Sequence, residues 1–323
     1  MGKIFSSQKK RQVRYYNTSD IRTGDFPFTK IVIEGGGMKI VPIAGTIRAL
    51  YTYDILKNIK YFAGTSAGSI IATALACGFA SDEIDKLVMD TDFSKFKDDT
   101  TGFLRDGYRL TASFGLCPGD YFLSWIEEKI ASKLGKKNAT FTDLFLKKQN
   151  RLYISSLCVE DDAIRVFSYE NTPDMVISKS VRMSMSIPLF FCPVKHEKKH
   201  YVDGGVSNNY PINMFDKAGR ESGETLGIKL MSPSEEKTSR IYSKKMKCDN
   251  IVSFSCSILS HILNEIERRE INENYWNRTL SVDTGTIGIL EFNINSFKKN
   301  KHIKRAYSDT MLQLEQYKKN KKF

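Results

Sequence analysis

Two strand-turn-helix units follow one another near the start of the chain, and they constrain its fold more than any other feature. The first unit joins a β-branched run at residues 29–34, three glycines, and a stretch with apolar residues at helical spacing over residues 39–53. The second unit, residues 61–79, repeats this order. Such units connect parallel strands through helices that cover the sheet. The sequence therefore predicts an α/β fold with a mainly parallel central sheet and helices on both faces.

The rest of the chain supplies more strands and helices but no clear domain boundary. We expect strands at residues 151–158, 163–169, 200–203 and 226–231, and helices at residues 120–134, 175–186, 251–271 and 306–317. No internal repeat is present, and the only candidate linker, residues 232–247, is too short to mark a domain boundary. We predict one main domain over residues 28–294, after a basic extension (residues 1–27) and before a C-terminal helix and basic tail (residues 295–323) that belong to the same globule.

Positive charge is concentrated at the two ends. The chain has 49 Lys and Arg residues against 37 Asp and Glu residues, a formal net charge of +12. Residues 1–27 hold six basic and two acidic residues, and residues 295–323 hold nine and two, so the part between them is almost neutral. This distribution argues against a nucleic-acid groove and fits contact with an anionic membrane surface. Solvated tails that only aid solubility are the alternative.

The start of the chain lacks the apolar segment of a secretory signal, and the sequence has no apolar run long enough to cross a membrane. We expect a cytoplasmic protein that associates peripherally with membranes, neither secreted by a signal peptide nor transmembrane. The first six residues match the N-myristoylation pattern, which makes Gly2 a candidate lipidation site. The six cysteines are scattered without metal-binding spacing, so we expect no metal site and no cofactor.

The segment Gly64-Thr65-Ser66-Ala67-Gly68 is a G-x-S-x-G pattern between a predicted strand and a predicted helix. Its two glycines allow a sharp turn that leaves the Ser66 hydroxyl exposed at the start of the helix, where the helix dipole favours a developing anion. A serine N-cap with packing glycines is the alternative. The flanking strand and helix favour a nucleophilic serine.

A second turn, Gly35-Gly36-Gly37 followed by Lys39, ends the first predicted strand. It lacks the third glycine of a dinucleotide fingerprint and the G-K-[ST] of a P-loop, which disfavours a nucleotide site. Consecutive glycine amides can point to one place, as an oxyanion hole requires. Lys39 could hold this loop or add positive potential, and a solvated lysine in the first turn of the helix is the alternative.

A third turn, Asp203-Gly204-Gly205, supplies a candidate base. Alone, an acid before two small residues is better explained as a buried turn. However, a serine nucleophile needs a proton acceptor, and no histidine follows a predicted strand on a turn as a triad histidine does: His196, His200, His261 and His302 all lie elsewhere. Asp203 is therefore the better candidate, provided that burial strengthens it, because an ordinary aspartate with a pKa of about 3.9 is a weak base.

Taken in chain order, as Gly35-Gly36-Gly37-Met38-Lys39, Gly64-Thr65-Ser66-Ala67-Gly68 and Asp203-Gly204-Gly205, the three turns resemble the motifs of the patatin-like phospholipase family. The resemblance extends from about Lys30 to about Leu230 and includes the stretch Ser184–Phe190, and the segment Val282–Gly288 resembles a later element of the family. It implies a patatin-like three-layer α/β/α fold with residues 28–294 as the catalytic domain. It further implies Ser66 as nucleophile, Asp203 as its base without a histidine, Gly35, Gly36 and Gly37 as the oxyanion hole, and Lys39, Gly64, Gly68, Gly204 and Gly205 as supporting loop residues.

The resemblance also implies a function. We expect a calcium-independent lipid acyl hydrolase of phospholipase A type, which cleaves fatty-acyl esters of membrane phospholipids through an acyl-enzyme. The expected partners are the lipid ester, an anionic membrane surface, and an activator or accessory protein, but no nucleic acid. Two alternatives remain: a soluble carboxylesterase with a Ser-His-Asp triad through His261 or His302, and a catalytically idle relative that binds lipid.

Overall fold

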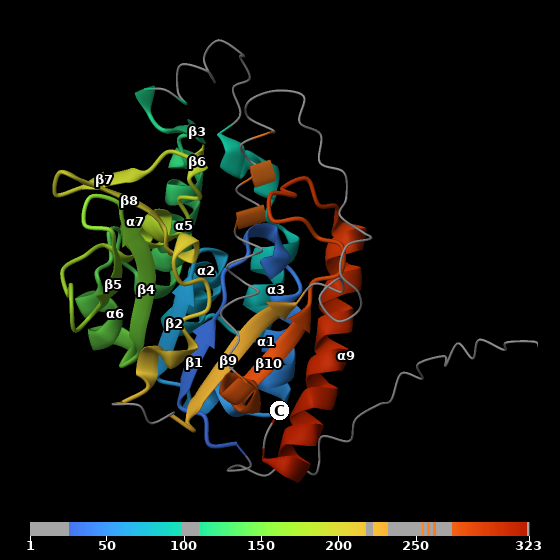
Figure 1. Cartoon of the computed structure of the whole chain (residues 1–323). Coiled ribbons are helices and arrows are strands. Elements are labelled where there is room, and N and C mark those ends of the chain that lie inside the picture. The colour runs from blue at the N-terminus through green and yellow to red at the C-terminus, as the bar shows by residue number, and fades with distance from the viewer. Residues whose placement is uncertain are drawn as a thin grey trace, which may run out of the picture.

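A sheet of eight strands forms the centre of the computed structural model, which describes residues 26–98, 110, 112–217, 222–231, 254, 257–258, 261–262, 273–321 and 323 (Figure 1). Its strands are β1 (Lys30–Ile33), β2 (Tyr61–Thr65), β4 (Arg151–Cys158), β5 (Ala163–Ser168), β7 (Val194–His196), β8 (Lys199–Asp203), β9 (Thr225–Met231) and β10 (Thr279–Asp283). A separate pair joins β3 (Gly115–Cys117) to β6 (Leu189–Phe191). Gly2, residues 232–247 and most of the predicted helix 251–271 lie outside the described residues.

Seven α-helices occur in the described part of the chain: α1 (Ile43–Thr52), α2 (Ala67–Cys77), α3 (Ser81–Met89), α5 (Asp120–Leu134), α6 (Phe141–Lys148), α7 (Ile177–Ser184) and α9 (Ser296–Asn320). Short 3-10 helices link them: η2 (Gly37–Ile40), η3 (Ile55–Asn58), η4 (Phe93–Lys97), η5 (Gly204–Val206), η6 (Ile212–Phe215) and η7 (Glu273–Arg278). The expected mixed α/β class is confirmed.

The sheet is mainly parallel, as predicted. Its strand order is β10-β9-β1-β2-β4-β8-β7, and every neighbouring pair from β10 to β4 is parallel. The β4–β8 and β8–β7 pairs are antiparallel, and β5 pairs antiparallel with β4. All the parallel strands therefore end at one edge of the sheet, which is where ligands bind in sheets of this type.

Strand β4 is longer than its neighbours and pairs with two of them in succession. Residues 151–155 pair with β2, and residues 156–158 pair with β8. The strands β2 and β8 thus meet end to end beside β4, with Thr65 opposite Ser155 and Asp203 opposite Ser156. This register brings the ends of two strands that are far apart in sequence to one point.

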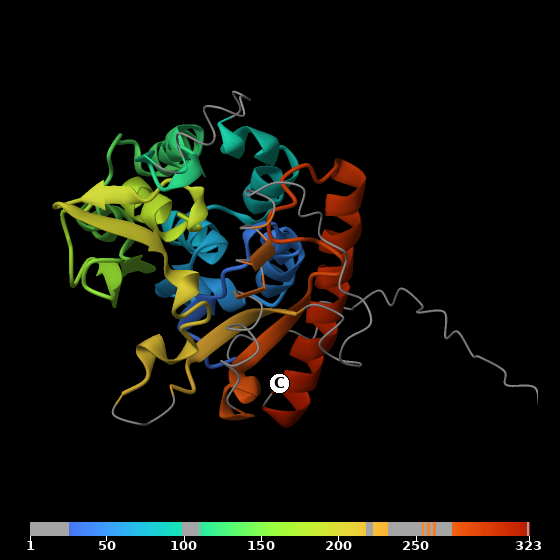
Figure 2. The same cartoon turned by 45° about the horizontal axis from the view of Figure 1, so that its top comes forward.

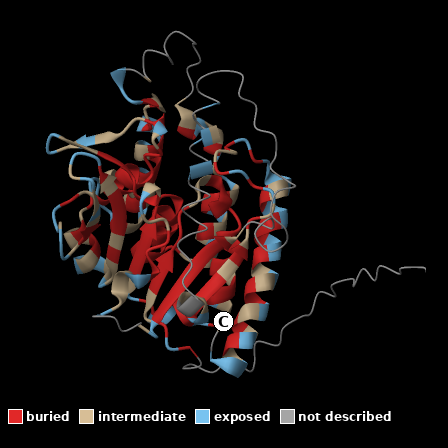
Figure 3. Cartoon of the chain, viewed as in Figure 1, coloured by how far each residue is buried: buried red, intermediate tan, exposed pale blue. Residues whose placement is uncertain are grey.

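The two faces of the sheet are covered differently. Ile31, Ile33 and Ile228 enter the main core with the apolar faces of the α-helices, whereas Val32 and Ala63 face the other way. On that second face, few of the described residues cover the strands. They are Tyr210 and the short helix η6, with η7 beside them. The strands are buried throughout the centre of the sheet (Figure 3).

Helix α9 runs along the β10 edge of the sheet, as both views show (Figures 1 and 2). The Gln313 side chain bonds both the N–H and the C=O of Ser281, and so satisfies backbone groups that an edge strand leaves open. Near the end of α9, the Tyr317 ring stacks on Phe26, which lies just before β1. Both ends of the described chain thus lie at the edge of the sheet where the parallel strands begin.

Most predicted elements agree with the structure within a few residues. Helix α1 follows Pro42, α2 ends at Gly78 in the left-handed conformation, and α5 has the predicted bounds. The prediction for the terminal helix was too short, because α9 begins at Ser296 rather than residue 306. The first turns of α9 carry several lysines, so the sequence there does not show the regular apolar spacing of an amphipathic helix. One of these lysines, Lys299, is nevertheless buried and donates to three backbone carbonyls. No helix within the described ranges is long and apolar enough to span a membrane.

Candidate active site

Ser66 lies in a strained turn between β2 and α2. Its backbone angles are φ 53° and ψ −131°, outside the regions that non-glycine residues normally adopt. The glycines on each side make this turn possible: a Cβ on Gly64 would lie 2.5 Å from the Gly68 carbonyl oxygen, and one on Gly68 would lie 2.4 Å from that of Ile33. The turn therefore depends on both glycines of the G-x-S-x-G segment.

A hydrogen-bond chain holds the Ser66 backbone in this conformation. The Ser66 N–H donates to Ser184 Oγ at 2.9 Å, and the Ser184 hydroxyl donates to the Ser155 carbonyl oxygen at 2.6 Å. All three residues are buried. Because the Ser66 N–H is engaged in this way, donors for an oxyanion must come from elsewhere.

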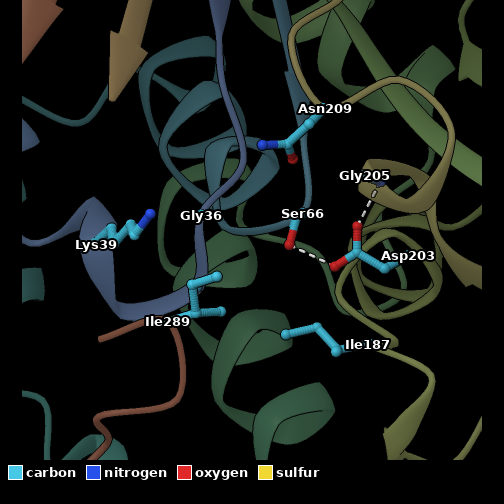
Figure 4. Close-up of a pocket in the computed structure, with 9 residues that line it drawn as sticks. Gly36, Lys39, Ser66, Ile187, Asp203, Gly205, Asn209 and Ile289 are labelled. Carbon is cyan, nitrogen blue, oxygen red and sulfur yellow. Dashed lines mark hydrogen bonds between the residues drawn. The ribbon is translucent and has the colours of Figure 1, made fainter. Parts of the chain in front are cut away.

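The Ser66 hydroxyl donates to Asp203 Oδ2 at 2.5 Å, and Figure 4 shows the two side chains facing each other across the pocket. The second oxygen, Asp203 Oδ1, accepts the N–H of Gly205 at 2.7 Å. Gly204 permits the strand end to approach β4, since a Cβ there would lie 2.8 Å from the Ser155 carbonyl oxygen. The carboxylate is thus fixed on both oxygens, with one of them directed at the serine.

Burial strengthens Asp203 as a base. Only 3% of its surface and 4% of that of Ser66 is exposed. Desolvation raises the pKa of Asp203 to about 7, although the hydrogen bonds from Ser66 and Gly205 partly counteract this shift. A carboxylate with such a pKa accepts a proton far more readily than an ordinary aspartate at neutral pH.

The glycine loop lies on the opposite side of Ser66. The Gly35 N–H donates to the Asn209 carbonyl oxygen at 3.1 Å, so this amide is not available to a substrate. Gly36 and Gly37 line the pocket, and neither of their N–H groups has an acceptor among the described residues. Gly37 must be glycine, with φ 54° and the Ile289 carbonyl oxygen 2.3 Å from where a Cβ would lie.

The pocket between these elements has basic and apolar walls as well. Lys39 is buried, with 6% of its surface exposed, and lines the pocket beside the glycine loop (Figure 4). Ile187 and Ile289 also line the pocket, and Ile289 lies against the glycine loop, where its carbonyl oxygen accepts the Met38 N–H at 2.8 Å. Their segments are joined by stacking of Phe190 on Phe292.

Three residues that line the pocket are absent from the predicted site: Asn209, Ile187 and Ile289. Asn209 has a sequence signal because it follows the Asp203-Gly-Gly turn on the same loop, and Ile187 has one because it lies within the stretch Ser184–Phe190. Ile289 enters the site through packing of a distant segment, which no local pattern reveals.

No histidine lines the pocket formed by the described residues. His196 bonds to Lys179 and His200 to Glu160, while His261 is exposed. His302 is buried on α9 against Gly285, and its Nδ1 has no hydrogen-bond partner among the residues that the structure describes. The described residues also contain no cluster of His, Cys, Asp or Glu side chains able to hold a metal ion.

A buried ion pair lies next to the glycine loop, at the end of β1. The carboxylate of Glu34, the residue before the loop, accepts hydrogen bonds from Lys229 Nζ at 2.5 Å and from the Leu230 N–H at 2.6 Å. The Lys229 ammonium also lies 5.0 Å from the centre of the Tyr210 ring. Removing one member of such a pair would leave a buried charge uncompensated, which is strongly destabilising.

Comparison with known sequences gives a consistent result. A family model described as patatin-like phospholipase matches residues 31–216. The uncharacterized protein YqhO of Bacillus subtilis is 30% identical over 305 residues, covering 88% of this chain and 98% of YqhO. An uncharacterized protein of Acanthamoeba polyphaga mimivirus is 29% identical over 286 residues, covering 88% of this chain and 92% of that protein. A protein of Invertebrate iridescent virus 6 named probable lipid hydrolase 463L is 29% identical over 197 residues, covering 59% and 64%.

Two solved structures have a similar fold. VipD from Legionella pneumophila matches with a TM-score of 0.66 at 16% identity, covering 90% of this chain and 67% of VipD. A chain of the ExoU–SpcU complex from the Pseudomonas aeruginosa type III secretion system matches with a TM-score of 0.56 at 18% identity, covering 91% of this chain and 52% of that chain. This chain thus spans about half the length of the second neighbour, and at these identities the similarity shows the fold alone.

Proposed function

The chain belongs to the patatin-like phospholipase family, and on this premise we propose that it is a lipid acyl hydrolase of phospholipase A type with a Ser66–Asp203 dyad. The observation that carries the proposal is the 2.5 Å hydrogen bond from the Ser66 hydroxyl to the buried Asp203 carboxylate. Residues 28–294 form the catalytic domain in this proposal. The substrate is a phospholipid or another lipid ester.

The proposed reaction has two halves. Asp203 Oδ2 takes the Ser66 hydroxyl proton while Ser66 Oγ attacks the acyl carbonyl carbon. The Gly36 and Gly37 N–H groups stabilise the oxyanion of the tetrahedral intermediate. When the ester C–O bond breaks, the leaving alcohol takes the proton from Asp203 and the acyl group remains on Ser66. Water then attacks the acyl-enzyme, Asp203 accepts its proton, and the fatty acid leaves as the proton returns to Ser66 Oγ.

Two other functions make different demands on the site. A soluble carboxylesterase with a triad needs a histidine within hydrogen-bond distance of Ser66. His302, on α9, instead packs against Gly285. A catalytically idle lipid-binding relative needs no base, yet the Asp203 carboxylate is buried beside the serine at a cost in stability. The dyad therefore accounts for more of the geometry than either alternative.

The direct test is fatty-acid release from mixed anionic phospholipid vesicles in excess chelator, together with labelling by a fluorophosphonate probe. We expect calcium-independent release and a probe adduct on Ser66. If the probe reacts but no lipid is cleaved, the chain needs an activator or accessory protein. If folded protein does neither, the idle relative is the better account.

Activity should depend on pH through Asp203. A base with a pKa of about 7 is largely protonated at pH 5 and largely ionised at pH 8. We expect kcat/KM for a short, uncharged ester to rise about tenfold per pH unit below neutrality and to level off above pH 8. A pH-rate profile of the purified protein checks this, and a flat profile between pH 5 and pH 8 would contradict Asp203 as the base.

We further propose that the basic ends hold the protein on anionic membrane. Lys318, Lys319 and Lys321 lie at the end of α9, at the edge of the sheet away from Ser66, so this contact would act as a tether separate from the pocket. Each basic group near such a surface contributes about 1 kcal/mol. Co-sedimentation with phosphatidylserine vesicles should fall sharply between low and high salt, while hydrolysis of a short soluble ester stays unchanged. Binding to neutral vesicles is the control. Equal losses of vesicle binding and of ester hydrolysis at high salt would contradict the proposed tether.

A further inference from the structure

We propose that Asn209 is a positioning residue that fixes the direction of the Gly36 N–H in the oxyanion hole. The inference rests on the proposed function and deepens it. Asn209 contacts Gly35 twice: its backbone carbonyl oxygen accepts the Gly35 N–H at 3.1 Å, and its side-chain Nδ2 donates to the Gly35 carbonyl oxygen at 3.0 Å. The amide is seen beside the glycine loop in Figure 4.

The geometry of the peptide unit gives this second bond its importance. The Gly35 carbonyl and the Gly36 N–H belong to one trans peptide, in which the two groups point in opposite directions. Because Asn209 Nδ2 holds the carbonyl on one side, the Gly36 N–H points to the other side. Gly36 lines the pocket, and its N–H has no acceptor among the described residues.

The neighbouring peptide is held by a different contact. The Gly36 carbonyl oxygen accepts the Lys39 N–H at 3.1 Å in the turn of η2, which directs the Gly37 N–H the opposite way. This turn is local, so the Gly37 N–H needs no help from another segment. The Gly35–Gly36 peptide lacks such a turn, and two glycines offer little resistance to a peptide flip. Asn209 supplies the restraint that the loop itself lacks.

The same loop also carries the base. Asp203 and Asn209 are six residues apart, and the loop folds back so that a Cβ on Gly205 would lie 2.6 Å from Asn209 Oδ1. One short segment thus holds the carboxylate beside Ser66 and the carbonyl of the opposing glycine loop. The proton acceptor and the oxyanion donor are therefore set relative to each other by a single element.

The test compares Asn209→Asp with Asn209→Ala. Aspartate has nearly the same shape as asparagine but cannot donate at that position when ionised, and its charge repels the Gly35 carbonyl and favours the flipped peptide. We expect kcat on a short-chain ester to fall about 10²-fold in both variants, with KM within about threefold of wild type, as for loss of one oxyanion donor. Asn208→Asp, which adds the same charge one residue earlier, is the matched control and should keep wild-type kinetics.

A thionoester substrate separates positioning from general damage. Sulfur accepts hydrogen bonds weakly, so a thionoester gains less from the oxyanion donors than the ester does. We expect the ester-to-thionoester rate ratio to fall about tenfold or more in both Asn209 variants and to stay unchanged in Asn208→Asp. Equal losses on both substrates, or wild-type kcat in Asn209→Asp, would overturn the inference. If wild type and Asn208→Asp also fail to cleave the ester, it is the proposed function that fails.

Discussion

Replacing Ser66 by alanine should abolish fatty-acid release, with a loss of at least about 10³-fold in kcat and little change in the folded structure. The hydroxyl donates to Asp203, whereas the strained backbone of the turn is held by the Ser66 N–H, which alanine retains. The measurement is fatty-acid release from anionic vesicles, with fluorophosphonate labelling as a second readout that should also be lost.

Ser132→Ala is the matched control for this experiment. Ser132 is exposed on α5, and its hydroxyl donates to the Lys129 carbonyl oxygen of the same helix. This variant should release fatty acid at the wild-type rate. Activity that persists in Ser66→Ala would show that the reaction does not pass through an acyl group on this serine.

Asp203→Asn should be the second variant without activity, at every pH. An asparagine of the same shape still accepts the N–H of Gly205, but it is unable to take the proton from Ser66. We expect a loss of at least about 10³-fold in kcat/KM on both vesicles and a short ester. Asp174→Asn, at an exposed position, is the matched control and should retain full activity.

The same variant should be more stable than wild type at alkaline pH. Burial raises the pKa of Asp203 in the folded state, so the unfolded chain binds fewer protons than the native one between about pH 4 and pH 7. Ionised Asp203 therefore lowers the free energy of unfolding above neutrality, and asparagine removes this cost. Thermal unfolding should show a higher Tm for Asp203→Asn at pH 8, with a difference that shrinks toward pH 4. Retained activity in a stable Asp203→Asn protein would exclude this residue as the base.

The glycine turns made the centre of the candidate site predictable. Ser66 and the glycines around it form a turn whose conformation depends on residues that are adjacent in the sequence, so a local pattern describes it well. Asp203 is also marked by the glycines that follow it. Its distance from Ser66 could not be derived from the pattern, because that distance depends on how β2 and β8 pair with β4.

Features that depend on packing between segments far apart in the sequence were not predicted. β10 is absent from the predicted strands, and its edge is completed by Gln313 of α9, a contact that only the folded chain creates. The start of α9 was hidden by its lysines, of which Lys299 is buried through carbonyl contacts with another segment. Asn209 acts on Gly35 across 174 residues of sequence. In each case the partner lies too far along the chain for a local pattern to indicate it.

The register of β4 has a consequence for how the protein becomes active as it folds. Ser66 and Asp203 come together only when both β2 and β8 have docked on the same strand, since residues 151–155 hold one and residues 156–158 the other. Contacts of this sequence separation form slowly, because a long loop must close before they contribute. A chain that has formed only its first two strand-turn-helix units would contain the serine and the glycine loop but no base. The onset of esterase activity during refolding would therefore report the docking of both β2 and β8 on β4.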